Sequence, residues 1–172
     1  MKLLSFDVES NGLHGEAFAV GAILYDTDTC QVESSVCYRM PIAGQVDDWV
    51  SENVLPQLVG VEITHDDAQT MRRDFWNWYL AHKDGAIVIV DVGYPVEARF
   101  LAACQDDDAS RKWQGPYPLH EVATMLQMAG VDPDTDRIAL VGDGLRGLQK
   151  HNPIDDAHAS AIVAGWLLTG HY

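Results

Sequence analysis

The sequence predicts a mixed α/β domain, with one sheet of about five strands and helices on both of its faces. Two patterns predict the sheet. Three strand-like segments with short links open the chain, which is typical of an antiparallel meander. Further along, a continuous apolar and β-branched run indicates a central strand covered on both sides. Because helical segments fill most of the remaining sequence, a single sheet packed between helices is the expected architecture.

The first three strands are expected at residues 2–8, 17–25 and 31–40. Residues 2–8 are rich in apolar side chains and end in acids. Residues 17–25 alternate between larger apolar residues and their neighbours, which is the period of a strand. Residues 26–29 read Asp-Thr-Asp-Thr and favour a turn between the second and third strands.

Two helices are expected before the central strand. Residues 46–58 have apolar residues near helical spacing, and Pro56 should end or kink that helix. Residues 67–82 form a clearer amphipathic pattern. The central strand itself is expected at residues 86–90, which read Ala-Ile-Val-Ile-Val.

The second half should be mainly helical. Helices are expected at residues 95–104, 118–128 and 155–168, and the first of them has Pro95 near its first turn. There is room for a very short strand at residues 116–119. Residues 132–148 have a loop-like composition with one short apolar stretch at 138–141.

Length and charge limit the class of protein. At 172 residues, the chain fits a single domain spanning residues 1–172. Its net charge of −15 argues against a protein that coats duplex nucleic acid, which would need a basic face. An enzyme acting on nucleic acid ends is still compatible with this charge, because carboxylates can bind cations that then contact phosphate.

Segments that would direct the chain to a membrane or a secretory route are not evident. No run of about 18 apolar residues occurs, so no membrane span is expected. The first residues do not resemble a signal peptide. The three cysteines, Cys30, Cys37 and Cys104, match neither a zinc nor a disulfide framework. They are expected to be reduced thiols in a cytoplasmic protein.

The first group of candidate functional residues lies at the end of the first strand. Asp7 and Glu9 are two residues apart and should therefore project to the same side of the sheet. Two carboxylates about 4 Å apart repel each other by roughly 4 kcal/mol at an effective dielectric constant of 20. A hard cation such as Mg²⁺ or Mn²⁺ would relieve that repulsion. The alternative is a strand end with two solvated acids.

The second group opens the last helix, in the segment His-Asn-Pro-Ile-Asp-Asp-Ala at residues 151–157. It can place the imidazole of His151 beside Asp156, where a neutral histidine can accept a proton. This segment alone leaves an alternative open. In it, Asp155 caps the helix, Asp156 interacts favourably with the helix dipole, and His151 is an ordinary surface residue.

The third group follows the central strand. That strand ends at Asp91, and Glu97 enters the next helix. Either carboxylate could reach the end of the first strand. The alternative is that both are solvated acids at the ends of their elements.

Together, these segments resemble the DEDDh branch of the DEDD superfamily of 3′→5′ exonucleases. Phe-Asp-Val-Glu-Ser-Asn-Gly-Leu at residues 6–13 is similar to the first motif of that family. The third motif is matched by residues 151–157, with four residues between His151 and Asp156. Residues 47–58 also resemble a small bacterial exoribonuclease group within the branch. The resemblance implies a ribonuclease-H-like fold.

The second motif departs from the family. The family has an Asp that follows an aromatic residue, with an Asn upstream. The corresponding positions here hold Glu97, Val96 and Gly93. A glutamate can bind a metal, but its longer side chain shifts the geometry. Glu97 is preferred at this position, and Asp91 is the competing candidate.

The resemblance also implies roles for individual residues. Two divalent cations, Mg²⁺ or Mn²⁺, would be held by Asp7, Glu9, Glu97 and Asp156. His151 would accept the proton of the attacking water, and nucleoside 5′-monophosphates would be released. The residues that follow the first motif should lie under the terminal nucleotide: Ser10, Asn11, Gly12 and Leu13, the last of which could wedge against a base.

The expected substrates are single-stranded RNA or short oligonucleotides, with DNA 3′ ends as a further option, and the family resemblance favours a homodimer. Two alternatives remain open. One is a nucleic-acid-binding module of the same fold with weakened chemistry. The other is a phosphohydrolase that acts on small nucleotides. The aromatic residues at helical spacing are expected to be mainly core residues: Trp49, Trp76, Trp78, Tyr79 and Trp166.

Overall fold

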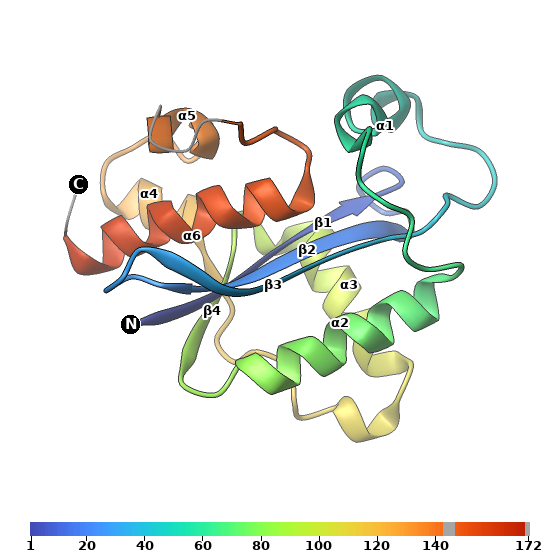
Figure 1. Ribbon diagram of the computed structural model, residues 1–172, viewed down its shortest axis with the longest axis horizontal. Coiled ribbons are helices and arrows are strands. Elements are labelled where there is room, and N and C mark those ends of the chain that lie inside the picture. Colours follow the sequence, from blue (N-terminus) through green and yellow to red (C-terminus); the bar gives the residue numbers. More distant parts are fainter. Residues whose placement is uncertain (143–146, 171–172) are drawn as a thin grey trace.

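The computed structural model describes residues 1–142 and 147–170, and in it the five-stranded mixed sheet is confirmed (Figure 1). The strand order is β3-β2-β1-β4-β5. Strands β1, β2 and β3 are antiparallel neighbours, whereas β4 runs parallel to β1 and β5 runs parallel to β4. The strands are β1 (Lys2–Ser10), β2 (Ala17–Asp26), β3 (Gln31–Arg39), β4 (Ala86–Val90) and β5 (His120–Glu121).

Helices lie between the strands and after the last of them, and one of them, α5 (Arg137–Val141), was not expected. They are α1 (Asp48–Asn53), α2 (Ala68–His82), α3 (Ala98–Asp106), α4 (Val122–Met128), α5 (Arg137–Val141) and α6 (Pro153–Thr169). Three shorter turns link them: η1 (Leu55–Leu58), η2 (Gly93–Glu97) and η3 (Ala109–Arg111). Within the described residues, no helix has the length and apolar character needed to cross a bilayer.

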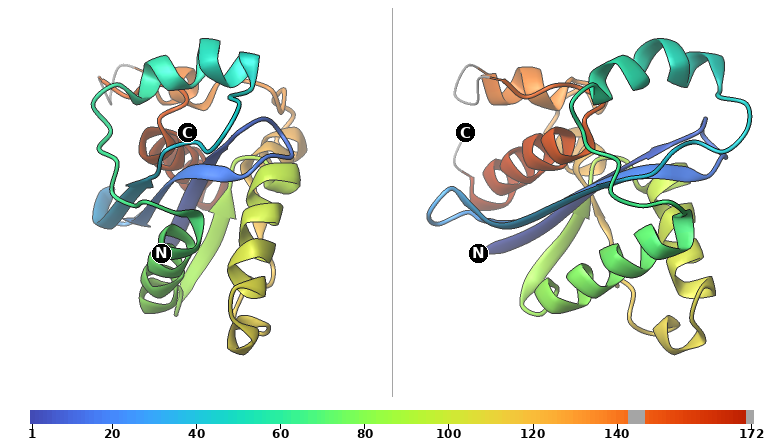
Figure 2. Two further views of the ribbon diagram at one scale, coloured as in Figure 1. Left: turned by 90° about the vertical axis from the view of Figure 1, so that its right-hand side faces the viewer. Right: turned by 45° about the vertical axis from the view of Figure 1, so that its right-hand side comes forward.

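Helices lie on both faces of the sheet (Figure 2), and the side chains of β1 alternate between a core layer on each face. Leu4, Phe6 and Val8 belong to the larger core cluster, which also contains the buried side chains of α2 and α3. Leu3 belongs to the second cluster, with residues of α4 and α6. Helices therefore cover both faces of the sheet, as predicted, and the side chains at positions 3, 5, 7 and 9 share the face of α6.

Element boundaries differ from the sequence predictions in several places. The helix expected at 46–58 is two pieces, α1 and η1, because Pro56 lies in the first turn of a new 3₁₀ segment. The short strand lies at His120–Glu121 instead of 116–119, so the helix after it begins at Val122. A two-residue strand is defined by its pairing with β4 and has no pattern of its own.

The loop-like stretch at 132–148 contains the helix α5, which Asp136 caps by accepting a hydrogen bond from the Ala139 amide. Residues 143–146 of that stretch lie outside the described residues. Helix α6 begins at Pro153, two residues earlier than expected, because proline is well suited to the first turn of a helix. The helix expected at 95–104 begins after the π-type turn η2 and runs to Asp106.

Candidate active site

The carboxyl end of β1 lies against the start of α6 because β2 has a glycine at the point of contact. Gly21 pairs with Asp7 in the sheet register. A Cβ atom at Gly21 would overlap the backbone of Pro153 and Ile154. Only a residue without a side chain lets the helix start approach this closely. The first turn of α6, which holds Asp156, is therefore brought beside the acids of β1.

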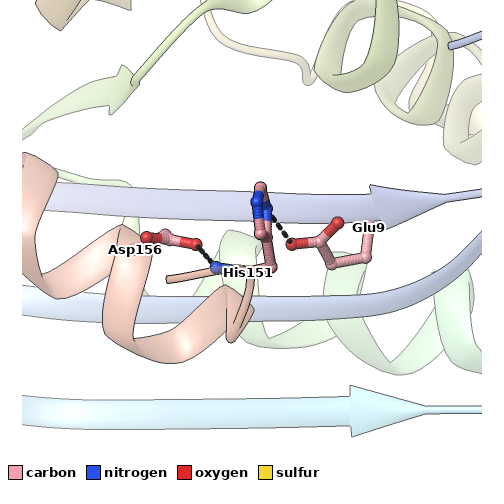
Figure 3. A group of neighbouring side chains, drawn as sticks. All are labelled: Glu9, His151 and Asp156. Carbon is pink, nitrogen blue, oxygen red and sulfur yellow. Dashed lines mark hydrogen bonds and ion pairs between the residues drawn. The ribbon is translucent and has the colours of Figure 1, made fainter. Parts of the chain in front are cut away.

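The loop before α6 places His151 in this same region (Figure 3). Its backbone N–H donates a hydrogen bond to Asp156 Oδ2 at 2.7 Å, and its Nδ1 lies 3.9 Å from Glu9 Oε1. One possible ligand atom from each of Glu9, His151 and Asp156 lies within 4.8 Å of the other two. The structure thus brings together three predicted site residues from two distant segments.

His151 has a strained backbone, with φ at +61°. This left-handed conformation is uncommon for a residue with a side chain and is often found at functional sites. The hydrogen bond to Asp156 holds the residue in this conformation. Asp155 stabilises the same loop, because its Oδ2 accepts a hydrogen bond from the Gln149 amide at 3.0 Å. Asp155 therefore stabilises the loop, whereas its neighbour Asp156 belongs to the cluster.

Burial and mutual repulsion raise the pKa values of the clustered acids. Glu9 is only 9% exposed, and desolvation, followed by repulsion from Asp156 and Glu97, raises its pKa to about 9. Desolvation first, and then Glu9, raise the pKa of Asp7 well above its usual value. The pKa values of Glu97 and Asp156 rise to about 7, again mainly through desolvation. The acids are therefore close enough to disfavour each other's charge.

This electrostatic arrangement suits divalent cations. Carboxylate oxygens and an imidazole nitrogen can bind a divalent cation, and no cysteine contributes to this group among the described residues. Buried acids that also repel each other gain from a bound cation, because its charge offsets both the lost hydration and the repulsion. The residues present thus fit a divalent cation.

Glu97 and Asp91 have different surroundings, and this bears on which of them completes the cluster. Glu97 lies in η2, is 7% exposed, and contributes to the raised pKa of Glu9. Asp91 Oδ1 lies 2.7 Å from both Nε and Nη2 of the buried Arg137. A carboxylate committed to a guanidinium is a poorer metal ligand than one without a cationic partner. The choice of Glu97 as the fourth ligand stays a prediction.

Trp49 lies beside the cluster, although the sequence interpretation expected it in the core. It is 55% exposed, and its ring meets the His151 ring edge-on, with 5.3 Å between the ring centroids. The sequence held one sign that Trp49 faces outward, namely the spacing of two core valines, one in α1 and one directly after it. Val50 and Val54 are four residues apart and are buried, so Trp49 lies off the face they define. The other four aromatics are fully or partly buried, as expected.

The loop after β1 anchors the helix that bears Trp49. Asn11 Nδ2 donates to Gln45 O at 2.9 Å, and the Asp47 amide donates to Asn11 Oδ1 at 2.8 Å. Asp47 in turn caps α1 by accepting a hydrogen bond from the Trp49 amide at 3.0 Å. The side chain of Asn11 is therefore occupied by contacts within the protein.

Three of the four residues predicted beneath the terminal nucleotide line a cavity of about 510 Å³ beside the cluster. They are Ser10, Gly12 and Leu13, and Glu9 and Trp49 line the same cavity. Gly12 has φ at +75°, where a side chain would be strained and would also crowd Asp47. The cavity combines a polar edge at Glu9 with apolar walls, which is typical of a small-ligand site.

No protein-family model and no curated protein sequence matches the chain. Solved structures do match. A full-length 3′-exonuclease is 16% identical, with a TM-score of 0.68 over 98% of this chain and 82% of that one. The nuclease domain of 3′hExo, a DEDDh family member bound to rAMP, is 16% identical, with a TM-score of 0.57 over 99% and 92%.

A third solved structure is the zinc-bound complex of E. coli ExoI with single-stranded DNA. It is 13% identical, with a TM-score of 0.68 over 99% of this chain and 41% of the longer ExoI chain. At these identities the comparisons concern the fold. The chain has the ribonuclease-H-like fold found in DEDDh-type 3′-exonucleases.

Proposed function

We propose that the chain is a metal-dependent 3′→5′ exonuclease that hydrolyses phosphodiester bonds at 3′ ends and releases nucleoside 5′-monophosphates. The observation that carries the proposal is the convergence of Glu9, His151 and Asp156, whose possible ligand atoms lie within 4.8 Å of one another. This convergence occurs at the end of β1, on a fold shared with solved 3′-exonucleases. In open α/β sheets, ligands generally bind at the carboxyl ends of the strands.

The metal ligands in this proposal are Asp7, Glu9, Glu97 and Asp156, with Mg²⁺ or Mn²⁺ as the two cations. Bound divalent cations supply a more acidic water and stabilise negative charge on the attacking and leaving oxygens. The four carboxylates are suited to this role because they are crowded, desolvated and rich in oxygen donors. Asp91 remains outside the set, since it pairs with Arg137.

His151 is the proposed general base. Burial, followed by the nearby charge of Lys150, lowers the pKa of His151 below its ordinary value of 6.5. The imidazole is therefore neutral near pH 7 and can accept the proton of the attacking water. The hydrogen bond from its backbone to Asp156 and the edge contact with Trp49 fix where the ring lies.

The cavity beside the cluster is the proposed site of the 3′-terminal nucleotide. Leu13 and Trp49 supply exposed apolar surface on which a base can stack or wedge. Gly12 keeps the loop backbone accessible to a sugar or phosphate. The site selects for an end because a terminal nucleotide fits into a cavity that continuous duplex would not enter.

Single-stranded RNA or short oligonucleotides are the proposed substrates, with DNA 3′ ends as poorer ones. This preference follows the motif resemblance, together with the solved structures of 3′-exonuclease with rAMP and with a histone mRNA stem-loop. The structure with single-stranded DNA shows that the same fold can also bind DNA. The acidity of the chain, with a net charge of −15, favours short ligands over duplex. A homodimer and a cytoplasmic location stay predictions.

The proposal is tested with oligomers of RNA and DNA, labelled at the 5′ end, incubated with the chain and Mn²⁺. We expect a ladder that shortens from the 3′ end, release of nucleoside 5′-monophosphates, and faster loss of the RNA. His151→Ala should reduce the rate by about 10²- to 10⁴-fold, the usual contribution of a general base. Asp84→Asn, which neutralises an exposed acid paired only with Lys83 among the described residues, is the matched control.

Three other results would contradict the proposal. A chain that binds the oligomers but leaves them intact with Mn²⁺ would be a binding module of this fold. A chain that hydrolyses only small phosphate esters or nucleotides would be a phosphohydrolase. Cleavage that is unchanged in His151→Ala would remove the proposed base.

A further inference from the structure

Beside the cavity of the terminal nucleotide lies a second hollow, of about 270 Å³, between the loop after β1 and helix α3. The two hollows share Ser10, Leu13 and Val96 in their linings. Leu13 is 66% exposed, and it forms a common wall together with Val96. A chain longer than one nucleotide that leaves the first cavity across this wall enters the second hollow.

The second hollow has two arginines and one acid in its lining, within a strongly acidic chain. Its charged lining residues are Arg72, Arg99 and Glu16. Arg72 is already committed, because its Nε and Nη2 donate to the two oxygens of Asp107 at 2.7 and 3.0 Å, and its Nη1 donates to Glu16 Oε1 at 3.4 Å. The available positive charge in the hollow is therefore that of Arg99.

Arg99 differs from most basic residues of this chain in its partner. Its Nη2 donates to the backbone oxygen of His14 at 2.9 Å, and within residues 1–142 and 147–170 no carboxylate lies at ion-pair distance from it. Its side chain is exposed. One hydrogen bond to a neutral oxygen leaves most of the donors of a guanidinium free, and a phosphate group is the ligand that such donors bind best.

We propose that this hollow binds the nucleotide that precedes the 3′-terminal one, with Arg99 contacting its phosphate. The site rests on the proposed function, which it deepens by naming where the substrate strand continues. Leu13 separates the two bases, and the apolar side chains of Val96 and Phe100 line the hollow beside the second nucleotide. The ligand class is a single-stranded oligonucleotide of at least two nucleotides.

Charge disfavours a substrate strand that leaves the site on the side of Asp156. The hollow behind Asp156 is lined by Asp91, Asp134, Asp136 and Asp156, against two cations, Arg137 and Lys150. Both cations are paired with acids of that same hollow. A phosphodiester strand passing there would meet a net negative wall, whereas one passing over Leu13 meets Arg99.

The test compares ligands of one and three nucleotides in a His151→Ala background, which keeps the longer ligand intact. With Mn²⁺ present, binding of AMP and of a fluorescent RNA trinucleotide is measured by competition. Arg99→Gln should weaken trinucleotide binding by about tenfold, the usual value of a charge-assisted hydrogen bond. The affinity for AMP should stay unchanged. Glutamine can still donate to His14, so the loop is expected to hold.

Salt dependence provides a second measurement. The plot of log affinity against log salt for the trinucleotide should lose about 0.7 of its slope in Arg99→Gln, as expected for one lost phosphate contact on a single strand. Arg73→Gln is the matched control. Arg73 is paired with Asp74 and lines a different hollow, so its removal changes net charge equally and should change neither slope nor affinity.

The results separate the two proposals. Equal losses in Arg99→Gln and Arg73→Gln would show a bulk charge effect and overturn the site. If Arg99→Gln lost equal affinity for AMP and for the trinucleotide, Arg99 would contact the terminal nucleotide instead. An unchanged affinity for the trinucleotide would also overturn the proposed second site. If the unmodified chain degrades oligomers in these cases, the proposed function stands without the second site. If the unmodified chain neither binds nor degrades oligomers, both fail.

Discussion

The two faces of β1 differ in what they contribute to the protein. Leu4, Phe6 and Val8 pack under α2 and α3 and are almost fully buried. On the opposite face, Asp7 and Glu9 are held close to Asp156 and Glu97, and all four have raised pKa values. Adjacent residues of one strand therefore have opposite effects on the free energy of unfolding. The apolar face stabilises the fold, and the acidic face lowers the stability of the metal-free protein.

The largest expected effect concerns the apolar face. Phe6 is fully buried, and its ring lies 5.4 Å from that of Phe75 between centroids. Phe6→Ala should lower the free energy of unfolding by about 3–5 kcal/mol, because the cavity cannot collapse between a strand and two helices. Urea unfolding followed by circular dichroism measures it. A loss below about 1 kcal/mol would mean that this face is not the main source of stability.

Metal binding should reverse the cost of the acidic face. Mn²⁺ at a hundred times its dissociation constant should stabilise the folded chain by about 2.7 kcal/mol, and thermal unfolding with and without the ion measures this. The effect should grow between pH 6 and pH 9, because the acids must lose their protons before they bind the cation. Stabilisation that is independent of pH would indicate a site elsewhere on the molecule.

Without metal, removing one acid should make the chain more stable. The folded pKa of Glu9 is about 9, above the ordinary 4.5. The stability linked to this carboxyl is thus fully present below pH 4.5 and is lost as the pH rises toward 9. In EDTA near pH 7, Glu9→Gln should raise the free energy of unfolding by on the order of 2 kcal/mol.

The matched control for Glu9→Gln is Glu62→Gln. Glu62 is exposed, so its replacement should change stability by less than about 0.5 kcal/mol. Destabilisation by Glu9→Gln under these conditions would contradict the view that the cluster is unfavourable without a cation. It would show instead that the Glu9 carboxylate makes favourable contacts within the protein.

The same contrast explains what could be predicted from the sequence. The apolar face follows from local alternation, so β1 to β4 and the two-sided sheet were predicted at nearly their observed positions. The acids at the end of β1 were also visible as a pair. Local patterns do not show which distant segments meet. The pairing of Asp91 with Arg137 joins residues 46 positions apart, and no periodicity encodes it.

Two further features of the site depend on tertiary contacts. Gly21 lets α6 approach the sheet, but in sequence it is simply a glycine within a strand. The exposure of Trp49 depends on how the short helix α1 is anchored over the end of β1, by contacts of Asn11 with residues 34 and 36 positions away. The sequence indicated the acids and three of the residues that line the cavity, Ser10, Gly12 and Leu13, whereas the place of Trp49 in the cavity wall required the structure.

The smallest expected effect tests that anchoring. Asn11→Ala removes two hydrogen bonds that hold the segment before α1. They are exposed, so the free energy of unfolding should fall by only about 1 kcal/mol. Because α1 then holds Trp49 less firmly beside His151, KM for a labelled oligomer should rise while kcat changes little. Steady-state kinetics on the same substrate measures both constants.

Asn53→Ala distinguishes anchoring from a general loosening of α1. Asn53 donates a hydrogen bond to the Trp49 carbonyl within the helix and does not contact the loop after β1 in the described structure. Its replacement should leave KM nearly unchanged. If Asn11→Ala lowered kcat and left KM fixed, the side chain would act on the reacting groups, and the amide contacts to residues 45 and 47 would not explain its role. The functional face of β1, which carries Asp7 and Glu9, would then also include the neutral side chain of Asn11, one residue past the end of the strand.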